Sequence, residues 1–350
     1  MHITLCKTGK IPIPPYGYGG TQRMVYWLGK ALIELGHQVT LIANAQSYIP
    51  GAELRALPDD EKDPRAWLRL IPDSTDLVHF HEPPTAPVNR PFLVTVHGNG
   101  QPGEQFIPNT VFVSRRHAAN HGACHFVYNG LDPGEYSFAE QREDYAVFLA
   151  KASWPVKNLH GAVQVAHRAR LELRVLGSRN WPVNLQRLLP PIRGVRYYGM
   201  IGGQKKRELL ARARCLIFPV RWHEPFGIGL IEALVSGCYV AATPYGSLPE
   251  IVTSEAGVLS AQADELVEAV NSPQRFNPLA CRDRVLRGGF THLDCARGYL
   301  NYYERILTKG SLGEPGEPAP ATRPGFAANQ LLPWDNCRAL AGRKLESIDR

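Results

Sequence analysis

Long apolar runs, paired cysteines and dense basic segments are all missing from this chain of 350 residues. No apolar run approaches the ~20 residues of a membrane-spanning helix, and we expect no signal peptide ahead of the first strand-like segment. The seven cysteines show no C-x-x-C and no metal-type spacing, which favours reduced thiols in the cytoplasm over a disulfide framework. The net charge of +7 is spread along the chain. We therefore expect no nucleic-acid partner, whereas a transient contact with the inner face of a membrane is permitted.

The fingerprint of a dinucleotide-binding loop is also absent. Gly17, Gly19 and Gly20 follow the first strand-like segment, but their spacing does not fit G-x-G-x-x-G. No acidic residue ends the second strand-like segment, 38–43, where a ribose would be held. Both absences argue against NAD. A turn without a ligand is the simpler interpretation of these glycines.

What is present is a regular alternation of strand-like and helix-like segments. Such alternation predicts an α/β fold with parallel sheets, and the length suggests two domains of ~150 residues. A segment rich in glycine and proline follows residue 308 and predicts disorder. The expected divisions are a Rossmann-like domain at 1–132, a second Rossmann-like domain at 133–290, a helix at 291–308 and a disordered tail at 309–350.

The segment 221–252 carries the clearest chemical pattern. An apolar strand at 215–220 leads into a turn, a helix opening at Phe226-Gly227 and a second strand at 239–242. Glu224 lies in the turn and Glu232 lies in the helix, with seven residues between them. That places the two carboxylates roughly 10 Å apart by helix rise.

A helix start between two carboxylates suits one elongated ligand. The first amides of a helix attract phosphate, and the carboxylates on either side can accept hydrogen bonds from hydroxyl groups. This describes a sugar nucleotide. The simpler alternative is a surface helix with solvated glutamates.

Other polar side chains follow strand-like segments. His97 follows the strand at 91–96, Lys151 follows the one at 145–150, and Lys157 precedes a helix. The carboxyl ends of parallel strands are where α/β proteins hold ligands. His79 and His81 share one side of a strand and favour packing over a metal pair, since no third ligand is evident. The cluster 205–207 is interpreted as a solvated helix face.

The pattern E-P-F-G-x-x-x-x-E-A-x-x-x-G, followed by P-x-G-x-x-P-E-I-V, resembles the signature of retaining GT-B glycosyltransferases of family 4, also called group 1. The resemblance covers about residues 1–308. It implies two Rossmann-like domains facing a central cleft, with a C-terminal helix crossing back to the first domain. It also implies transfer of a sugar, typically a hexose, from a nucleoside-diphosphate sugar to a hydroxyl group with retained configuration.

The resemblance also implies roles for individual residues. Glu224 would hold the sugar hydroxyls, Glu232 the ribose, and His97 would lie beside the sugar. Lys157 matches a family lysine that binds the diphosphate, whereas Lys151 replaces a family arginine and its bidentate contact with a single charge. The implied catalytic residues are His97, Lys151, Lys157 and Glu224. The implied donor-binding residues are Gly19, Gly20, Lys151, Lys157, Met200, Glu224, Phe226, Gly227, Ile228 and Glu232.

No metal or other cofactor is expected, because the chain has no D-x-D, the acidic pair that holds a metal on a sugar nucleotide in the other main transferase architecture. The donor would be of the UDP or GDP type and the acceptor an unidentified sugar or lipid-linked molecule in polysaccharide or glycolipid assembly. The alternative enzyme is an epimerase or hydrolase of sugar nucleotides, which needs acid–base carboxylates beyond Glu224. A basic protein that binds a membrane or nucleic acid would leave the two glutamates unexplained.

Overall fold

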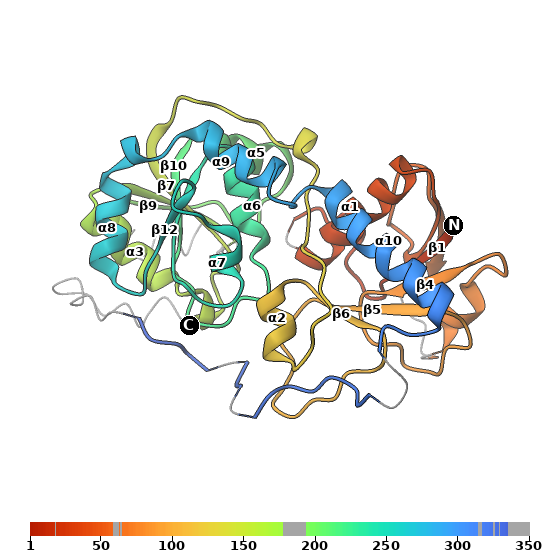
Figure 1. The fold of residues 1–350 in the computed structure, drawn as a ribbon. Coiled ribbons are helices and arrows are strands. Elements are labelled where there is room, and N and C mark those ends of the chain that lie inside the picture. The colour runs from red at the N-terminus through yellow and green to blue at the C-terminus, as the bar shows by residue number, and fades with distance from the viewer. Residues whose placement is uncertain are drawn as a thin grey trace. The chain divides into compact units, whose positions relative to one another are not determined.

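A computed structural model describes residues 1–17, 19–58, 63, 65–177, 194–313, 317–324, 326–328 and 330–334. The chain forms two compact units, Met1–Asp132 with Gly289–Ala328 and Pro133–Gly288 with Asn329–Arg350 (Figure 1). Each unit contains one six-stranded sheet, and all the strand pairs in both sheets are parallel. The α/β prediction is therefore confirmed.

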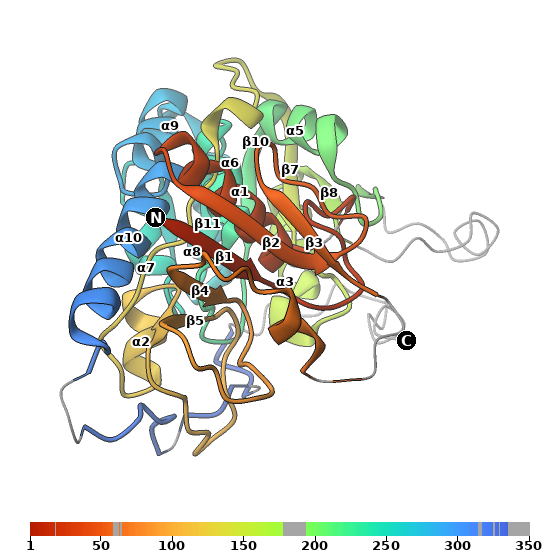
Figure 2. The same cartoon turned by 90° about the vertical axis from the view of Figure 1, so that its right-hand side faces the viewer.

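The sheet of unit 1 has the order β3-β2-β1-β4-β5-β6, and β3, β2, β1, β4 and β5 can be followed in this order in Figure 2. In register, Ile3 of β1 lies opposite Val39 on one side and Leu77 on the other. The strands are β1 His2–Cys6, β2 Gln38–Asn44, β3 Glu53–Leu57, β4 Leu77–Phe80, β5 Phe92–Val96 and β6 Thr110–Phe112. The helices are α1 Gly20–Glu34, η1 Ala66–Leu70, α2 Arg115–Asn120 and α10 His292–Lys309.

Helices α1 and α10 pack against each other on one face of this sheet, and η1 lies over an apolar cluster on β1, β2, β4 and β5. Helix α10 begins with a capping box, in which Thr291 and Asp294 satisfy each other's backbone amides. Its Tyr299 and Tyr303 are 2% and 0% exposed. The predicted C-terminal helix thus forms part of unit 1.

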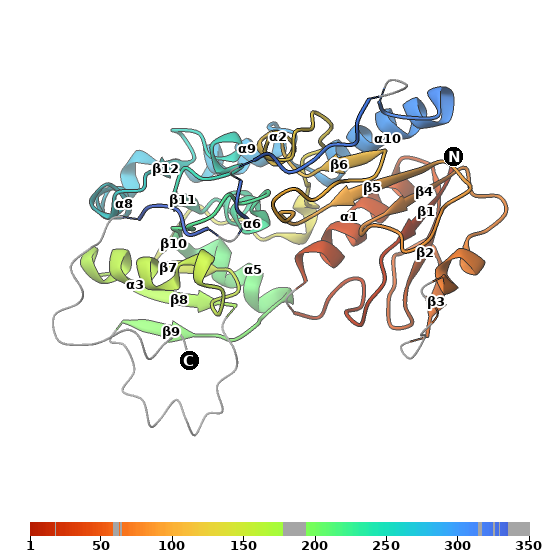
Figure 3. The ribbon, with the colours of Figure 1, turned by 90° about the horizontal axis from the view of Figure 1, so that it is seen from below.

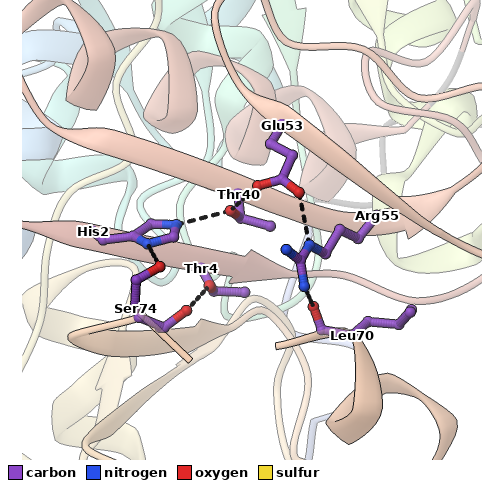
Figure 4. A network of polar contacts seen from close by, with 8 residues as sticks. His2, Thr4, Thr40, Glu53, Arg55, Leu70 and Ser74 are labelled. Carbon is purple, nitrogen blue, oxygen red and sulfur yellow. Dashed lines mark hydrogen bonds and ion pairs between the residues drawn. The ribbon is translucent and has the colours of Figure 1, made fainter. Parts of the chain in front are cut away.

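Polar side chains join the strands of unit 1 at their amino ends (Figure 4). His2 Nε2 lies 2.8 Å from Thr40 Oγ1, and its Nδ1 lies 3.0 Å from Ser74 Oγ. Arg55 Nη1 donates to the carbonyl of Leu70 at 3.2 Å. These side chains thus form hydrogen bonds that link neighbouring segments at this end of the sheet.

The sheet of unit 2 has the order β12-β11-β10-β7-β8-β9 (Figure 3). Its strands are β7 Glu143–Leu149, β8 Glu172–Leu176, β9 Val195–Tyr197, β10 Ala213–Phe218, β11 Tyr239–Ala242 and β12 Gly257–Leu259. The α-helices are α3 Leu159–Arg168, α5 Gly203–Arg212, α6 Ile228–Val235, α7 Leu248–Ile251, α8 Ala263–Asn271 and α9 Pro278–Leu286. Short 3₁₀ turns are η2 Pro133–Glu135, η3 Pro155–Lys157 and η4 Pro273–Arg275. Helix α3 packs against α8, and α6 packs against α9.

The predicted disordered tail, 309–350, lies partly outside the described residues, and some of its described residues pair with neighbouring loops. Thr322 is 3% exposed and its amide donates to the carbonyl of Glu104, while Ala321 forms a bridge with Gln105. These contacts lie in unit 1. Farther along, the amide of Leu332 donates to the carbonyl of Arg221 in unit 2 at 2.7 Å. Proline and glycine prevent a helix here, but an extended backbone can still pair with a neighbouring loop, and that pairing orders the described part of this segment.

None of the helices in the described ranges combines the length and apolar character that crossing a bilayer demands. The six cysteines in those ranges are free thiols.

Candidate functional site

Strand order locates the candidate site in unit 2. Strands β7 and β10 are central neighbours, and the chain order reverses between them. Ligands of open parallel sheets bind outside the carboxyl ends of strands at such a reversal. The segments that follow these two strands, 150–158 and 219–227, contact each other there: the amide of Arg221 donates to the carbonyl of Val156 at 2.7 Å, and Asn158 Nδ2 donates to the carbonyl of Pro219 at 2.9 Å.

A buried ion pair joins the two segments. Lys157 Nζ donates to Glu224 Oε2 at 2.6 Å, and each residue is 7% exposed. Trp222 Nε1 donates to the same oxygen at 2.6 Å. The ammonium also lies 4.6 Å from the Trp222 ring centroid, a favourable cation–π arrangement. The structure thus brings together Lys157 and Glu224, which are 67 positions apart in the chain.

Helix α6 begins next to this pair. Gly227 precedes it with φ of 87°, and no side chain among the described residues caps its first turn. The amides at this end therefore carry the partial positive charge that attracts anions. Phe226 is only 2% exposed and its carbonyl accepts from Ser247 Oγ. A ligand would thus meet the backbone of Phe226, because its ring belongs to the core.

The segment that follows β11 packs against the backbone of the turn that contains Glu224. Gly246 has φ of 66°, and a Cβ at this position would lie 2.3 Å from the backbone N and O of Glu224. The next amide, that of Ser247, donates to the carbonyl of Glu224 at 3.0 Å. This close approach explains why the pattern around Glu224 continues into P-x-G-x-x-P-E.

The second glutamate is also paired. Glu232 lies in α6, is 4% exposed, and accepts from Lys206 Nζ at 2.5 Å and from the hydroxyl of Tyr136. Lys206 is 7% exposed, so the prediction of a solvated helix face at 205–207 is wrong for this residue. The signal was available, because Lys206 precedes Leu209 and Leu210 by three and four positions and so shares their buried helix face.

The remaining predicted residues occupy three places. Lys151 follows β7, half-buried, with Nζ 4.7 Å from the ring centroid of Trp154. Met200 lies half-buried in the turn after β9, and Ile228 is the first residue of α6. Gly19 and Gly20, at the start of α1, and His97, which follows β5, belong to unit 1.

Metal-binding side chains do not gather in the described ranges: no group of three or more His, Cys, Asp or Glu residues there could hold an ion. His79 and His81 instead stack, with ring centroids 4.2 Å apart. His79 is completely buried and is held by Tyr303 and Thr95.

Known proteins with related sequences are glycosyltransferases. Residues 143–272 match the family of glycosyl transferases group 1. O-antigen chain mannosyltransferase B of Escherichia coli is 29% identical over 168 residues, which cover 43% of this chain and 42% of that protein. The match thus spans less than half the length of this relative.

Solved structures match most of the chain. AviGT4, a glycosyltransferase involved in avilamycin A biosynthesis, has a TM-score of 0.73 at 26% identity, with 88% of this chain and 98% of that chain covered. HepE of Anabaena in complex with UDP-glucose has a TM-score of 0.63 at 13% identity, with 87% and 100% covered, and shows the fold alone. We conclude that the chain carries a group 1 glycosyltransferase domain in a GT-B fold, which confirms the predicted fold and class of enzyme.

Proposed function

We propose that the protein transfers a glycosyl group from a nucleoside-diphosphate sugar to a hydroxyl group of a sugar or lipid-linked acceptor, with retention and without a metal ion. The observation that carries the proposal is the buried Lys157–Glu224 pair beside the uncapped start of α6. It places a cation, a helix N-terminus and a carboxylate at the strand reversal of unit 2. These are the groups that a diphosphate and its attached sugar require.

In the proposed reaction the bond between the anomeric carbon and the diphosphate oxygen breaks, and the acceptor oxygen bonds to that carbon on the same face. The acceptor proton passes to the departing diphosphate, so no nucleophile from the protein is needed. Lys151, Lys157 and the α6 amides meet the charge on the diphosphate as it departs. His97 lies beside the transferred sugar, and the Met200 backbone holds the base.

The two carboxylates would orient the ligand at its two ends. Both contacts of Glu224 go to Oε2, and Oε1 accepts no hydrogen bond from the described residues, so this oxygen is the one we assign to a sugar hydroxyl. Glu232 would accept from the ribose hydroxyls. Lys206 holds the charge of Glu232 in place while it does so.

The names of related proteins support the donor class and a role in building polysaccharides or glycolipids. HepE of Anabaena has been crystallised with UDP and with UDP-glucose, and the Escherichia coli relative is named for O-antigen chains. By this analogy the donor carries UDP, and a GDP-type donor is the alternative that the family resemblance implies. A cytoplasmic location with transient membrane contact would suit a lipid-linked acceptor.

The first test measures binding of UDP, GDP, ADP and NAD to the wild-type protein by calorimetry and thermal shift. We expect one nucleoside diphosphate to bind and, at a hundred times its Kd, to stabilise the protein by about 2.7 kcal/mol. Glu232→Gln should weaken that binding about tenfold, because a neutral amide is a poorer acceptor than a carboxylate. Glu268→Gln, on the solvent side of α8, is the matched control and should bind normally. Binding of NAD alone, or of none of the four, would refute the proposal.

A further inference from the structure

Unit 1 has a strand reversal of its own, between β1 and β4. Lys7 directly follows β1 and His81 directly follows β4, while His97 follows the next strand, β5. Lys7 pairs with Glu82 at 2.7 Å. A second polar cluster therefore lies where an open parallel sheet presents side chains to a ligand, and His97 is its only member to which a role has been given so far.

The two histidines of this cluster form a pair. His81 Nδ1 lies 3.0 Å from His97 Nε2, and the ring centroids are 5.3 Å apart. His81 is 5% exposed and stacks on His79. His79 is fixed in turn, because its two ring nitrogens lie 2.7 Å from Tyr303 Oη and 2.7 Å from Thr95 Oγ1. His79 thus fixes the ring of His81 on one side, and His81 contacts His97 on the other.

Both histidines are neutral near pH 7. Burial, with the nearby Lys7 ammonium adding to it, lowers the pKa of His97 to about 3. Burial also holds the pKa of His81 well below its usual value. A neutral pair carries two ring N–H groups, and the bond between the rings uses one of them.

The protonation of the two outer nitrogens is therefore coupled, because one of them carries the remaining N–H and the other does not. If His81 Nδ1 donates, the remaining N–H is at His97 Nδ1; if His97 Nε2 donates, it is at His81 Nε2. Both outer atoms are buried, and neither has a hydrogen-bond partner among the described residues. Buried polar atoms are nearly always satisfied, and an exception in a native structure calls for a ligand or water.

We propose that His81 is a positioning residue, which fixes the ring orientation of His97 and couples its tautomer to that of His81, so that His97 Nδ1 meets a hydroxyl group of the transferred sugar. The inference rests on the proposed function, since it gives a partner to a residue placed beside the sugar.

The test compares the Kd of the nucleoside diphosphate with that of the intact nucleotide sugar, in wild type, His81→Phe and His81→Asn. In His81→Phe the ring can still stack on His79 but cannot bond to His97. We expect the diphosphate to bind as in wild type and the intact donor to bind about tenfold more weakly, the worth of a lost buried hydrogen bond. Asn places a polar nitrogen or oxygen near the position of Nδ1 and should restore donor binding to within about threefold. His167→Phe, at an exposed position on α3, should change neither Kd.

Equal loss of affinity in the Phe and Asn variants, or none in either, would overturn the role of His81 while leaving the proposed function intact. Failure of the wild type to bind any nucleoside diphosphate would overturn both. Nitrogen NMR of histidine-labelled wild type gives an answer that needs no His81 variant. The intact donor should shift the ring-nitrogen signals of both His81 and His97, and the diphosphate alone should shift neither; a shift of neither signal with the intact donor would refute the pairing.

Discussion

At the scale of single residues, each of the two predicted glutamates forms a buried ion pair with a lysine. Each carboxylate is less than a tenth exposed, and each is matched by a lysine buried to the same degree, Lys157 for Glu224 and Lys206 for Glu232. A buried charge without a partner is costly, and in each pair the lysine offsets the cost of burying the carboxylate. A glutamate in solvent would be a weaker and less directed acceptor.

At this scale we predict strong coupling between Lys157 and Glu224. Lys157→Met and Glu224→Gln should each lower the free energy of unfolding of unit 2 by about 3 kcal/mol, because each leaves one buried charge without its counter-charge. The double variant should lose clearly less than the sum of the two. Urea unfolding of the three variants measures this coupling.

The control for this prediction is an exposed ion pair in the same unit. Arg275 and Glu268 lie 3.8 Å apart with side chains 54% and 73% exposed. Glu268→Gln should cost less than about 1 kcal/mol. Additive losses for Lys157 and Glu224 would mean that the two residues act independently.

At the scale of elements, turns and helix starts position the residues of the candidate site. The turn of Glu224 is supported by the turn after β11, and the two backbones are so close at Gly246 that only a residue without a side chain fits. Part of the C-terminal segment adds a third support, since Arg221 Nε donates to the carbonyl of Leu332 at 2.8 Å and Tyr245 Oη to that of Pro333 at 2.7 Å.

Gly246→Ala should therefore displace the Glu224 turn. We expect it to lower the free energy of unfolding by more than 2 kcal/mol, through steric overlap in addition to its positive φ, and to weaken binding of the nucleoside diphosphate at least tenfold. Gly289→Ala has a similar φ, 81°, with open space around its Cβ. It should cost only about 1 kcal/mol and leave binding unchanged. Calorimetric binding and urea unfolding of both variants check this, and equal effects would show that backbone strain alone is responsible.

At the scale of the whole molecule, the two units share one sheet order but differ in their buried titratable groups. Unit 1 contains His79, His81, His117 and His121, each at most 5% exposed. Burial lowers the pKa of all four, that of His117 to about 3 and that of His121 to about 4. Unit 2 has its paired carboxylates and lysines instead.

Unit 1 should consequently be the more sensitive unit to acid. Below the unfolded histidine pKa of about 6.5, the unfolded chain binds protons that the folded unit does not, so stability falls as the pH drops toward 4. Each of these histidines contributes up to about 1.4 kcal/mol per pH unit in that window.

Hydrogen exchange at pH 7.5 and 5.5, corrected for the intrinsic pH dependence of exchange, measures this loss of stability in each unit. Amides of β4 and β5 should lose protection by at least tenfold more than those of β7 and β10. Parallel loss of protection in both units would contradict the prediction.

The sequence by itself determined the α/β class and the residues of the central motif. The spacing of apolar residues and the positions of glycine and proline specify helices and strands locally. Glu224, Gly227 and Glu232 lie within one strand–turn–helix unit, so residues close together in the chain are also close together in space. The GT-B fold followed from the resemblance of this motif to a known family.

Only the tertiary structure decided which distant residues meet those of the motif. Lys206 pairs with Glu232, His81 with His97, and residues 317–322 and 330–334 lie along loops of the two units. Such contacts depend on strand order and helix packing, which bring together positions separated by 16 to more than 200 residues. Neither charge nor composition reveals them, because a lysine on a helix or a proline-rich segment is usually solvated until a particular fold supplies its partner.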